Sequence, residues 1–187
     1  FDVFVEYAKA DQNDLLIQIE AVNRSSKPAP LVLIPTVWFR NTWAWGRTGE
    51  GHTIKPRVSL LSNDRFLLVH PQLDPFVLFL DPKSAAQAPL TLFTDNETNK
   101  KRLFGGENST PFVKDAFHEY IVDGVTSAVD PTCTGTKACF ALDTMIAPGE
   151  SFTLRLRLKP SAAPLHDTFG DDFDEVMQTR RRECVEF

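Results

Sequence analysis

The chain has 187 residues, of which 42% are hydrophobic and 24% are charged, and its formal net charge is -5. This size favours one domain with an appended element, and the composition excludes disordered and collagen-like chains. The 20 Lys and Arg are outnumbered by the 25 Asp and Glu, so we expect no nucleic-acid partner. The longest apolar runs, 31–34 and 76–80, are far shorter than the roughly 20 residues that span a bilayer, which predicts no membrane partner.

Short segments with alternating apolar residues, separated by turn residues, run through the first 160 residues. From Phe1 to Tyr7 the apolar side chains already alternate with the period of a strand. This pattern is typical of an antiparallel β-sandwich, so we predict an all-β domain over residues 1–160. The expected strands are 1–8, 15–23, 31–39, 66–70, 76–80, 90–94, 118–122, 137–143 and 152–158.

Two of these segments predict their own place in the sheets. Segment 31–39 is apolar on both faces, so we place it centrally, with Pro35 marking a bulge or a break. In segment 152–158, Leu154 and Leu156 alternate with Arg155 and Arg157, which predicts a strand that is buried on one side only.

The C-terminal part predicts a linker followed by a helix. Residues 161–164 read as the linker, and the acidic residues after Asp171 precede the arginines 180–182, an order that suits a helix dipole. The apolar stripe of this helix consists of Phe173, Val176, Met177, Cys184 and Phe187. Because a strand begins at the first residue and the stripe continues to the last, we expect a piece of a longer polypeptide.

All three tryptophans, Trp38, Trp43 and Trp45, fall within eight positions, together with Arg40 and Asn41. Indole faces stack on sugar rings while Arg and Asn bind hydroxyl groups, so the cluster is compatible with a possible oligosaccharide partner. The alternative is a core or domain-interface cluster, where Trp and Arg are also enriched. The residues alone do not separate the two interpretations.

Polar residues concentrate again at Asp95, Asn96 and Glu97, and then at 114–119. The first group lacks the spacing of a calcium loop, and we expect no metal and no cofactor. Asp115, His118 and Glu119 are compatible with an acid–base group. The alternative is a set of solvent-facing carboxylates paired with Lys114 or Lys137.

The cysteines leave the compartment open. Cys133 and Cys139 are close enough in sequence to pair across a hairpin, or they are unrelated small residues, and Cys184 is expected to pack within the helix stripe. Asn23, Asn96 and Asn108 each begin a glycosylation sequon, which matters only in a secreted protein. A cytoplasmic location is our expectation, with the secretory pathway as the alternative.

With these clusters in hand, the sequence resembles the N-terminal region of glycoside hydrolase family 63, which includes processing alpha-glucosidase. The resemblance covers most of the chain through five motifs: FDVFVEYAK at 1–9, WFRNTW at 38–43, FTDNETN at 93–99, VKDAFHEY at 113–120 and GTK at 135–137.

The resemblance implies a β-sandwich of the supersandwich type that precedes an (α/α)6 catalytic barrel of the same polypeptide, with 161–187 as the start of the connection. It implies an inverting hydrolase whose two catalytic carboxylates lie in the barrel, so no catalytic residue is expected in this chain. The sandwich would brace the barrel and shape its sugar pocket. The candidate contact residues are Arg40, Asn41, Trp43, Trp45, Asp95, Asn96, Glu97, Lys114, Asp115, His118 and Glu119.

Three hypotheses therefore stay open. The chain is the non-catalytic domain of a glycoside hydrolase, a self-sufficient carbohydrate-binding module, or a structural interaction domain. The first predicts no hydrolysis by the isolated chain, the second predicts saturable sugar binding, and the third predicts an exposed apolar patch made for a partner.

Overall fold

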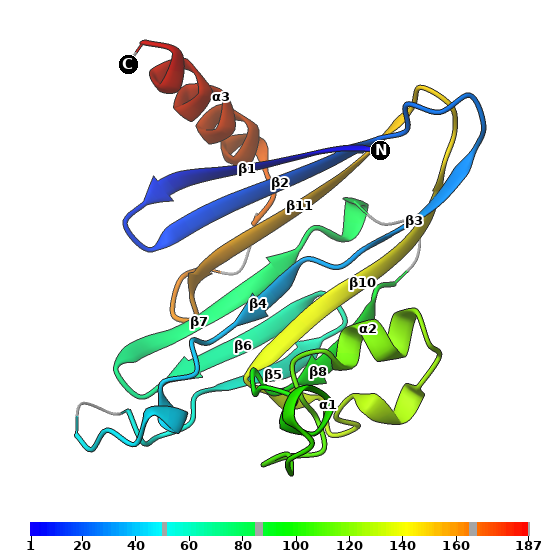
Figure 1. The fold of residues 1–187 in the computed structure, drawn as a ribbon. Helices are drawn as coiled ribbons and strands as arrows, with labels where there is room; N and C mark the ends of the chain where they lie inside the picture. The colour runs from blue at the N-terminus through cyan, green and yellow to red at the C-terminus, as the bar shows by residue number, and fades with distance from the viewer. Residues whose placement is uncertain (50–51, 85–87, 165–167, 187) are drawn as a thin grey trace.

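In a computed structural model, which describes residues 1–49, 52–84, 88–164 and 168–186, most of the chain forms antiparallel strands (Figure 1). The larger sheet has seven strands in the order β1-β2-β11-β7-β6-β5-β9, and the smaller sheet is built around β10. The predicted all-β sandwich is confirmed. The larger sheet consists of β1 (Asp2–Asp11), β2 (Asp14–Val22), β5 (Arg57–Ser62), β6 (Arg65–His70), β7 (Leu73–Leu80), β9 (Thr134–Gly135) and β11 (Ser151–Pro160).

The smaller sheet shows what Pro35 does to the predicted strand 31–39. This segment forms two strands, β3 (Ala29–Leu33) and β4 (Thr36–Trp38), which pair in succession with β10 (Lys137–Ile146). Proline has no N–H to give to a ladder, and its carbonyl accepts the N–H of Phe140 at 3.3 Å. The strand is therefore broken while β10 stays continuous. β10 pairs with β3 and β4 on one side and with β8 (Leu90–Thr94) on the other, so the predicted central place of 31–39 is wrong.

The main core lies between the two sheets. The ring of Phe66 from β6 stacks on Phe140 from β10, with centroids 3.9 Å apart, and meets Phe93 edge-on at 5.1 Å. All three are almost completely buried, and each such side chain contributes about 1.5–3 kcal/mol relative to an exposed one. The other buried members of this core are Val58, Leu68, Leu78, Leu80, Ala138, Leu142, Leu154 and Leu156.

The chain passes from one sheet to the other at Gly135. This residue belongs to β9 of the larger sheet, and β10 of the smaller sheet begins two residues later. A Cβ atom at position 135 would lie 2.3 Å from the carbonyl oxygen of Thr94, so only glycine fits at this corner.

The outer face of the smaller sheet is covered by α2 (Ala116–Ile121), with η3 (Thr126–Ala128) after it. Phe117 packs with Leu92, Cys139 and Ala141. The predicted strand 118–122 is therefore wrong. Its apolar residues continue a helical face that begins two residues earlier, and the N–H of Val122 donates to the carbonyl of His118 at 2.8 Å.

Short helical segments fill other connections: α1 (Lys100–Phe104), η1 (Trp43–Trp45) and η2 (Pro82–Ser84). In α1, Asn99 accepts the N–H of Arg102, and Gly105 ends the helix with φ 67°. These Asn and Gly positions are ordinary helix start and stop signals that our sequence analysis did not use.

The outer face of the larger sheet is covered at one end by α3 (Asp171–Glu186), which lies beside β1 in Figure 1. Phe173 and Met177 pack against Ala8 of β1 and Leu16 of β2, so the predicted helix is confirmed. Cys184 is exposed, which corrects its predicted packing, and Phe187 lies outside the described residues. Within the described residues, none of the helices is long and apolar enough to cross a membrane.

The prediction that β11 is buried on one side only fails at Arg157. This side chain is only 6% exposed, and its guanidinium contacts Asp14 at 2.8 Å and Asp172 at 2.9 Å. The Asp14 carboxylate, by accepting these hydrogen bonds, raises the pKa of Arg157. Helix α3 and the segment before it thus cover a face that alternation alone assigns to solvent.

The structure also bears on the sequon at Asn23 and on the cysteines. Asn23 is 1% exposed, and its side-chain amide donates to the carbonyls of Lys27 and Ile146, both at 2.8 Å. A glycan has no access to this side chain in the folded chain. All three cysteines are free, and burial raises the pKa of the Cys139 thiol to about 12.

Candidate functional site

Two surface loops that are more than 50 residues apart in sequence meet at one end of the sandwich. Glu97 joins them: its carboxylate accepts the indole N–H of Trp43 at 2.5 Å and the amide of Asn41 at 3.0 Å. The same amide donates to the backbone carbonyl of Asn96 at 3.1 Å. We call this set the aromatic–acid cluster; its members are Arg40, Asn41, Trp43, Trp45, Asp95, Asn96 and Glu97.

The polar residues of the aromatic–acid cluster hold backbone in place. The side chain of Asn96 donates to the carbonyl of Phe39 at 2.9 Å, and its backbone N–H donates to the hydroxyl of Thr136 at 2.8 Å. Asp95 accepts a hydrogen bond from Lys55 at 2.7 Å and another from the backbone N–H of Thr136 at 3.2 Å. Both carboxylates of the cluster are therefore committed to fixed donors, which suits a scaffold better than a general acid or base.

The tryptophans are held but not buried. Cationic groups lie over Trp45, with Arg40 at 4.7 Å and Arg47 at 5.3 Å from the ring centroid, and His52 stacks with it at 6.2 Å. Trp45 is nevertheless 43% exposed, and Trp38 is 58% exposed. A pure core role for these side chains is thus excluded, and an interface or a binding platform is left.

The second predicted group borders a groove of about 380 Å³ between α2 and the β3–β4 edge. Lys114, Asp115 and His118 line it, whereas Glu119 is not part of its lining. Asp115 accepts hydrogen bonds from Arg102 at 3.1 Å and from Asn99. Among these described side chains, no hydrogen bond joins Asp115, His118 and Glu119 into an acid–base group, and the Asp115 partner is Arg102 rather than a lysine.

Lys137 ties the groove to the sheet. Its ammonium donates to the carbonyl of Lys114 at 2.6 Å and lies 4.6 Å from the ring of Phe117, and burial lowers its pKa. The backbone N–H of Lys114 donates to the carbonyl of Glu97 at 3.0 Å, so the groove and the aromatic–acid cluster share one backbone frame. In the described part of the chain, no group of three or more His, Cys, Asp or Glu residues could hold a metal ion.

Sequence reasoning missed four contributors to this site: Arg47, His52, Lys55 and Thr136. Lys55 and Thr136 both reach Asp95, from 40 and 41 positions away in the sequence. Neither has a local pattern that indicates this contact. Arg47 directly follows the tryptophans and could have been included on the strength of its charge beside an aromatic cluster.

A comparison with known proteins identifies a longer relative in yeast. No model of a protein family matches the chain. The chain is 33% identical, over an alignment 220 residues long, to the uncharacterized protein YMR196W of Saccharomyces cerevisiae. The alignment covers all of this chain and 20% of the yeast protein, so the chain spans about a fifth of that relative.

Proposed function

We propose that the chain is a non-catalytic β-sandwich domain of an alpha-glucosidase-like glycoside hydrolase, where it contacts and braces a helical catalytic domain of the same polypeptide. The observation that carries the proposal is the aromatic–acid cluster, in which Glu97 fixes the half-buried Trp43 while Trp45, held by Arg40 and Arg47, stays exposed. Rigid aromatic and Arg side chains of this kind are enriched in interfaces. The five sequence motifs and the greater length of the yeast relative support the same proposal.

The chemistry of this chain supports a bracing role rather than a catalytic one. An inverting glycosidase needs two carboxyl groups about 6.5–9.5 Å apart, one of them protonated and both facing the substrate. Asp95, Glu97 and Asp115 instead accept hydrogen bonds from fixed amide, indole and cationic donors. The sandwich would then act on sugar only by shaping the rim of a pocket that lies elsewhere in the polypeptide.

The first test is the mass of the native polypeptide in its source, measured by intact mass spectrometry after capture with an antibody against this chain. We expect a mass several times 21.0 kDa and alpha-glucoside hydrolysis by the whole polypeptide but not by residues 1–187 alone. Hydrolysis by the pure chain, or a native mass of 21.0 kDa, would contradict the proposal.

The second test removes the bridge at Glu97 in the whole polypeptide. Glu97→Ala frees Trp43 and Asn41, and we expect weaker domain association and at least a severalfold loss of hydrolysis. The matched control is Glu107→Ala, an exposed acid in the same part of the sequence. Equal behaviour of the two variants would count against the cluster as a contact.

A carbohydrate-binding module is the second candidate, and the exposure of Trp38 and Trp45 favours it. Titration of Trp fluorescence with oligosaccharides separates the two. A saturable change at millimolar sugar that Trp45→Ala abolishes would support the module. If the fluorescence does not change, the domain-contact role is the remaining candidate for Trp38 and Trp45.

A further inference from the structure

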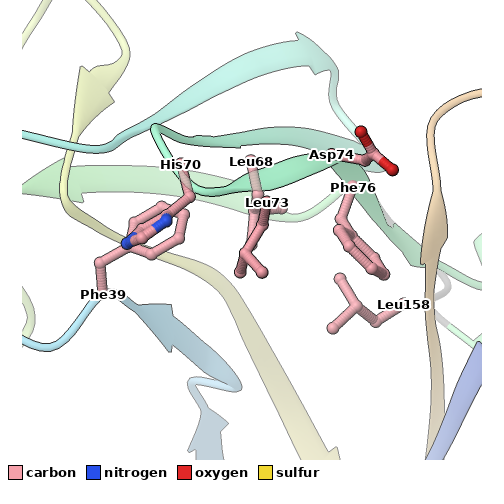
Figure 2. Close-up of a pocket in the computed structure, with 7 residues that line it drawn as sticks. All are labelled: Phe39, Leu68, His70, Leu73, Asp74, Phe76 and Leu158. Atoms are coloured by element: carbon pink, nitrogen blue, oxygen red, sulfur yellow. The ribbon is translucent and has the colours of Figure 1, made fainter. Parts of the chain in front are cut away.

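A small apolar hollow lies where the larger sheet extends beyond the smaller one, at the β6–β7 hairpin. Figure 2 shows four side chains from three strands pointing into one space, namely Leu68, Leu73, Phe76 and Leu158. The rings of Phe39 and His70 close one end, 5.6 Å apart, and the carboxylate of Asp74 points away. The hollow measures about 210 Å³ and opens to the surface. We call it the hairpin hollow.

The size and chemistry of the hairpin hollow select its occupant. Dry cavities of about 150 Å³ lined by Leu, Ile and Phe take up benzene, whereas a water needs two to four polar partners. Four of the seven lining residues are Leu or Phe from the sheet, and Phe39 adds a fifth apolar wall. One aromatic ring therefore suits the space better than water or a charged group.

His70 contributes its ring to one end of the hollow, and its Nδ1 accepts the backbone N–H of Gln72 at 3.2 Å. The exposed lining is apolar throughout, so the hollow selects for the face of a ring rather than for a hydrogen bond.

The position of Phe39 shows where such a ring would come from. Its ring lines the hairpin hollow, while its backbone carbonyl accepts the side chain of Asn96 in the aromatic–acid cluster. A partner seated on the cluster therefore reaches the mouth of the hollow along the same edge of the sandwich. A fixed pocket filled by one aromatic side chain is the usual form of an interface anchor.

We propose that the hairpin hollow is an anchor pocket for one aromatic side chain, supplied by the part of the polypeptide that covers the aromatic–acid cluster. The source of the side chain rests on the proposed function above. The capacity of the hollow for an aromatic ring does not, so the two are tested separately.

The capacity test uses p-cresol, the side-chain analogue of tyrosine, and methyl NMR of the 187-residue chain. We expect saturable shifts at Leu68, Leu73 and Leu158 with a dissociation constant on the order of 1 mM, a range that small ligands of this size reach. Leu73→Trp fills the hollow from its rim and should weaken binding at least about tenfold. The control is Leu61→Trp, at an exposed position outside the lining, which should bind p-cresol like the wild type. Absence of saturable shifts in the wild type would overturn the proposal.

The source test uses the native polypeptide with a benzophenone amino acid at position 74, which borders the hollow but points out of it, so that the hollow stays free (Figure 2). We expect photo-crosslinks to a peptide from outside residues 1–187 that contains an aromatic residue at or beside the linked site. Crosslinks confined to residues 1–187 would overturn the assignment of the occupant. A native mass of 21.0 kDa would defeat the proposed function, while the p-cresol titration would still decide whether the hollow holds a ring.

Discussion

The two faces of the β1–β2 hairpin differ in how far their side chains are buried. On the outer face, Ala8 and Leu16 are 3% and 0% exposed because Phe173 and Met177 of α3 lie on them. On the inner face, Val3 and Val5 are 49% and 46% exposed, although their partners on β2 point toward the main core. Helix α3 thus seals the outer face of the hairpin around Ala8 and Leu16, although Phe4 on that face is 50% exposed, while the inner face of β1 is left open.

This difference separates the face that contacts α3 of the same chain from the face that the described residues leave exposed. A sheet in a layered domain buries its apolar face against another layer, and contiguous apolar side chains that stay exposed on a sheet mark an interaction surface. The sealed face combines apolar contact with the ion pairs of Arg157, whereas the described side chains of the open face on β1 include Val3, Val5, Tyr7 and Lys9. We expect substitutions on the two faces to differ sharply in cost.

The largest effect is expected from Phe173→Ala, which removes a fully buried ring from the sealed face. Loss of such a side chain costs about 3–5 kcal/mol of unfolding free energy. Urea unfolding measures it, and Val185→Ala on the exposed side of the same helix is the control, with a change near zero. A cost for Phe173→Ala below about 1 kcal/mol would show that α3 does not seal this face.

Arg157→Met should be the next largest, at about 2–3 kcal/mol, because it leaves Asp14 and Asp172 without their cationic partner. The value lies below that of a fully buried pair because the Asp172 side chain is half exposed. Arg24→Met removes the exposed pair with Asp2 and should cost less than about 1 kcal/mol. Equal costs for the two arginines, measured by urea unfolding, would contradict the buried role of Arg157.

A smaller, pH-dependent effect is expected for Glu6→Gln at the edge of the sealed face. Arg181 bonds Glu6 and holds the pKa of that carboxyl below its usual value of about 4.3. Because the pKa of Glu6 is lower in the folded state, the pair stabilises the fold fully at pH values above the unfolded-state pKa. This contribution is lost as the pH falls through the folded-state pKa.

The variant should therefore be less stable than the wild type by about 0.5 kcal/mol at pH 7, since the pair is exposed, and by nothing near pH 2. Parallel urea titrations at the two pH values, with and without added salt, measure this difference. A difference that grows toward low pH would have the wrong sign and would refute the pairing.

The smallest effect is expected from Val5→Thr on the open face, within about 0.5 kcal/mol. Ile19→Thr is the matched comparison, because Ile19 pairs with Val5 across the hairpin and packs against the main core. It should cost clearly more in the same unfolding assay. Equal costs would mean that Val5 is covered in the isolated chain and would remove the contrast between the faces.

The predictions from sequence succeeded where one strand carries its own pattern. β11 is predicted because its apolar residues alternate from Phe152 to Leu158, and α3 because its acidic start and apolar stripe agree. β5 was missed, since a register shift between Leu60 and Ser62 interrupts its alternation. β9 has only two residues, and its pairing with Val58 of β5 defines it.

The sequence predicts the residue types of the candidate site but not the hydrogen bonds that connect them. Clustered Trp, Asn and Glu residues are visible in the sequence, whereas the bond from Trp43 to Glu97 spans 54 positions and follows from the sandwich topology. The same holds for Arg157 and Asp14, which are 143 positions apart. Long-range pairs of this kind have no local signature, so alternation assigned Arg157 to solvent.

The corner at Gly135 has a mechanical consequence. There the backbone leaves the larger sheet and enters the smaller one within a few residues. It runs so close to the carbonyl of Thr94 that no side chain fits at position 135. The two layers are also joined beside β2, where the side chain of Asn23 donates to the carbonyl of Ile146 in β10. Separation of the layers is therefore restrained at both places, and amide hydrogen exchange should be slow at residues 134–137 and around Asn23.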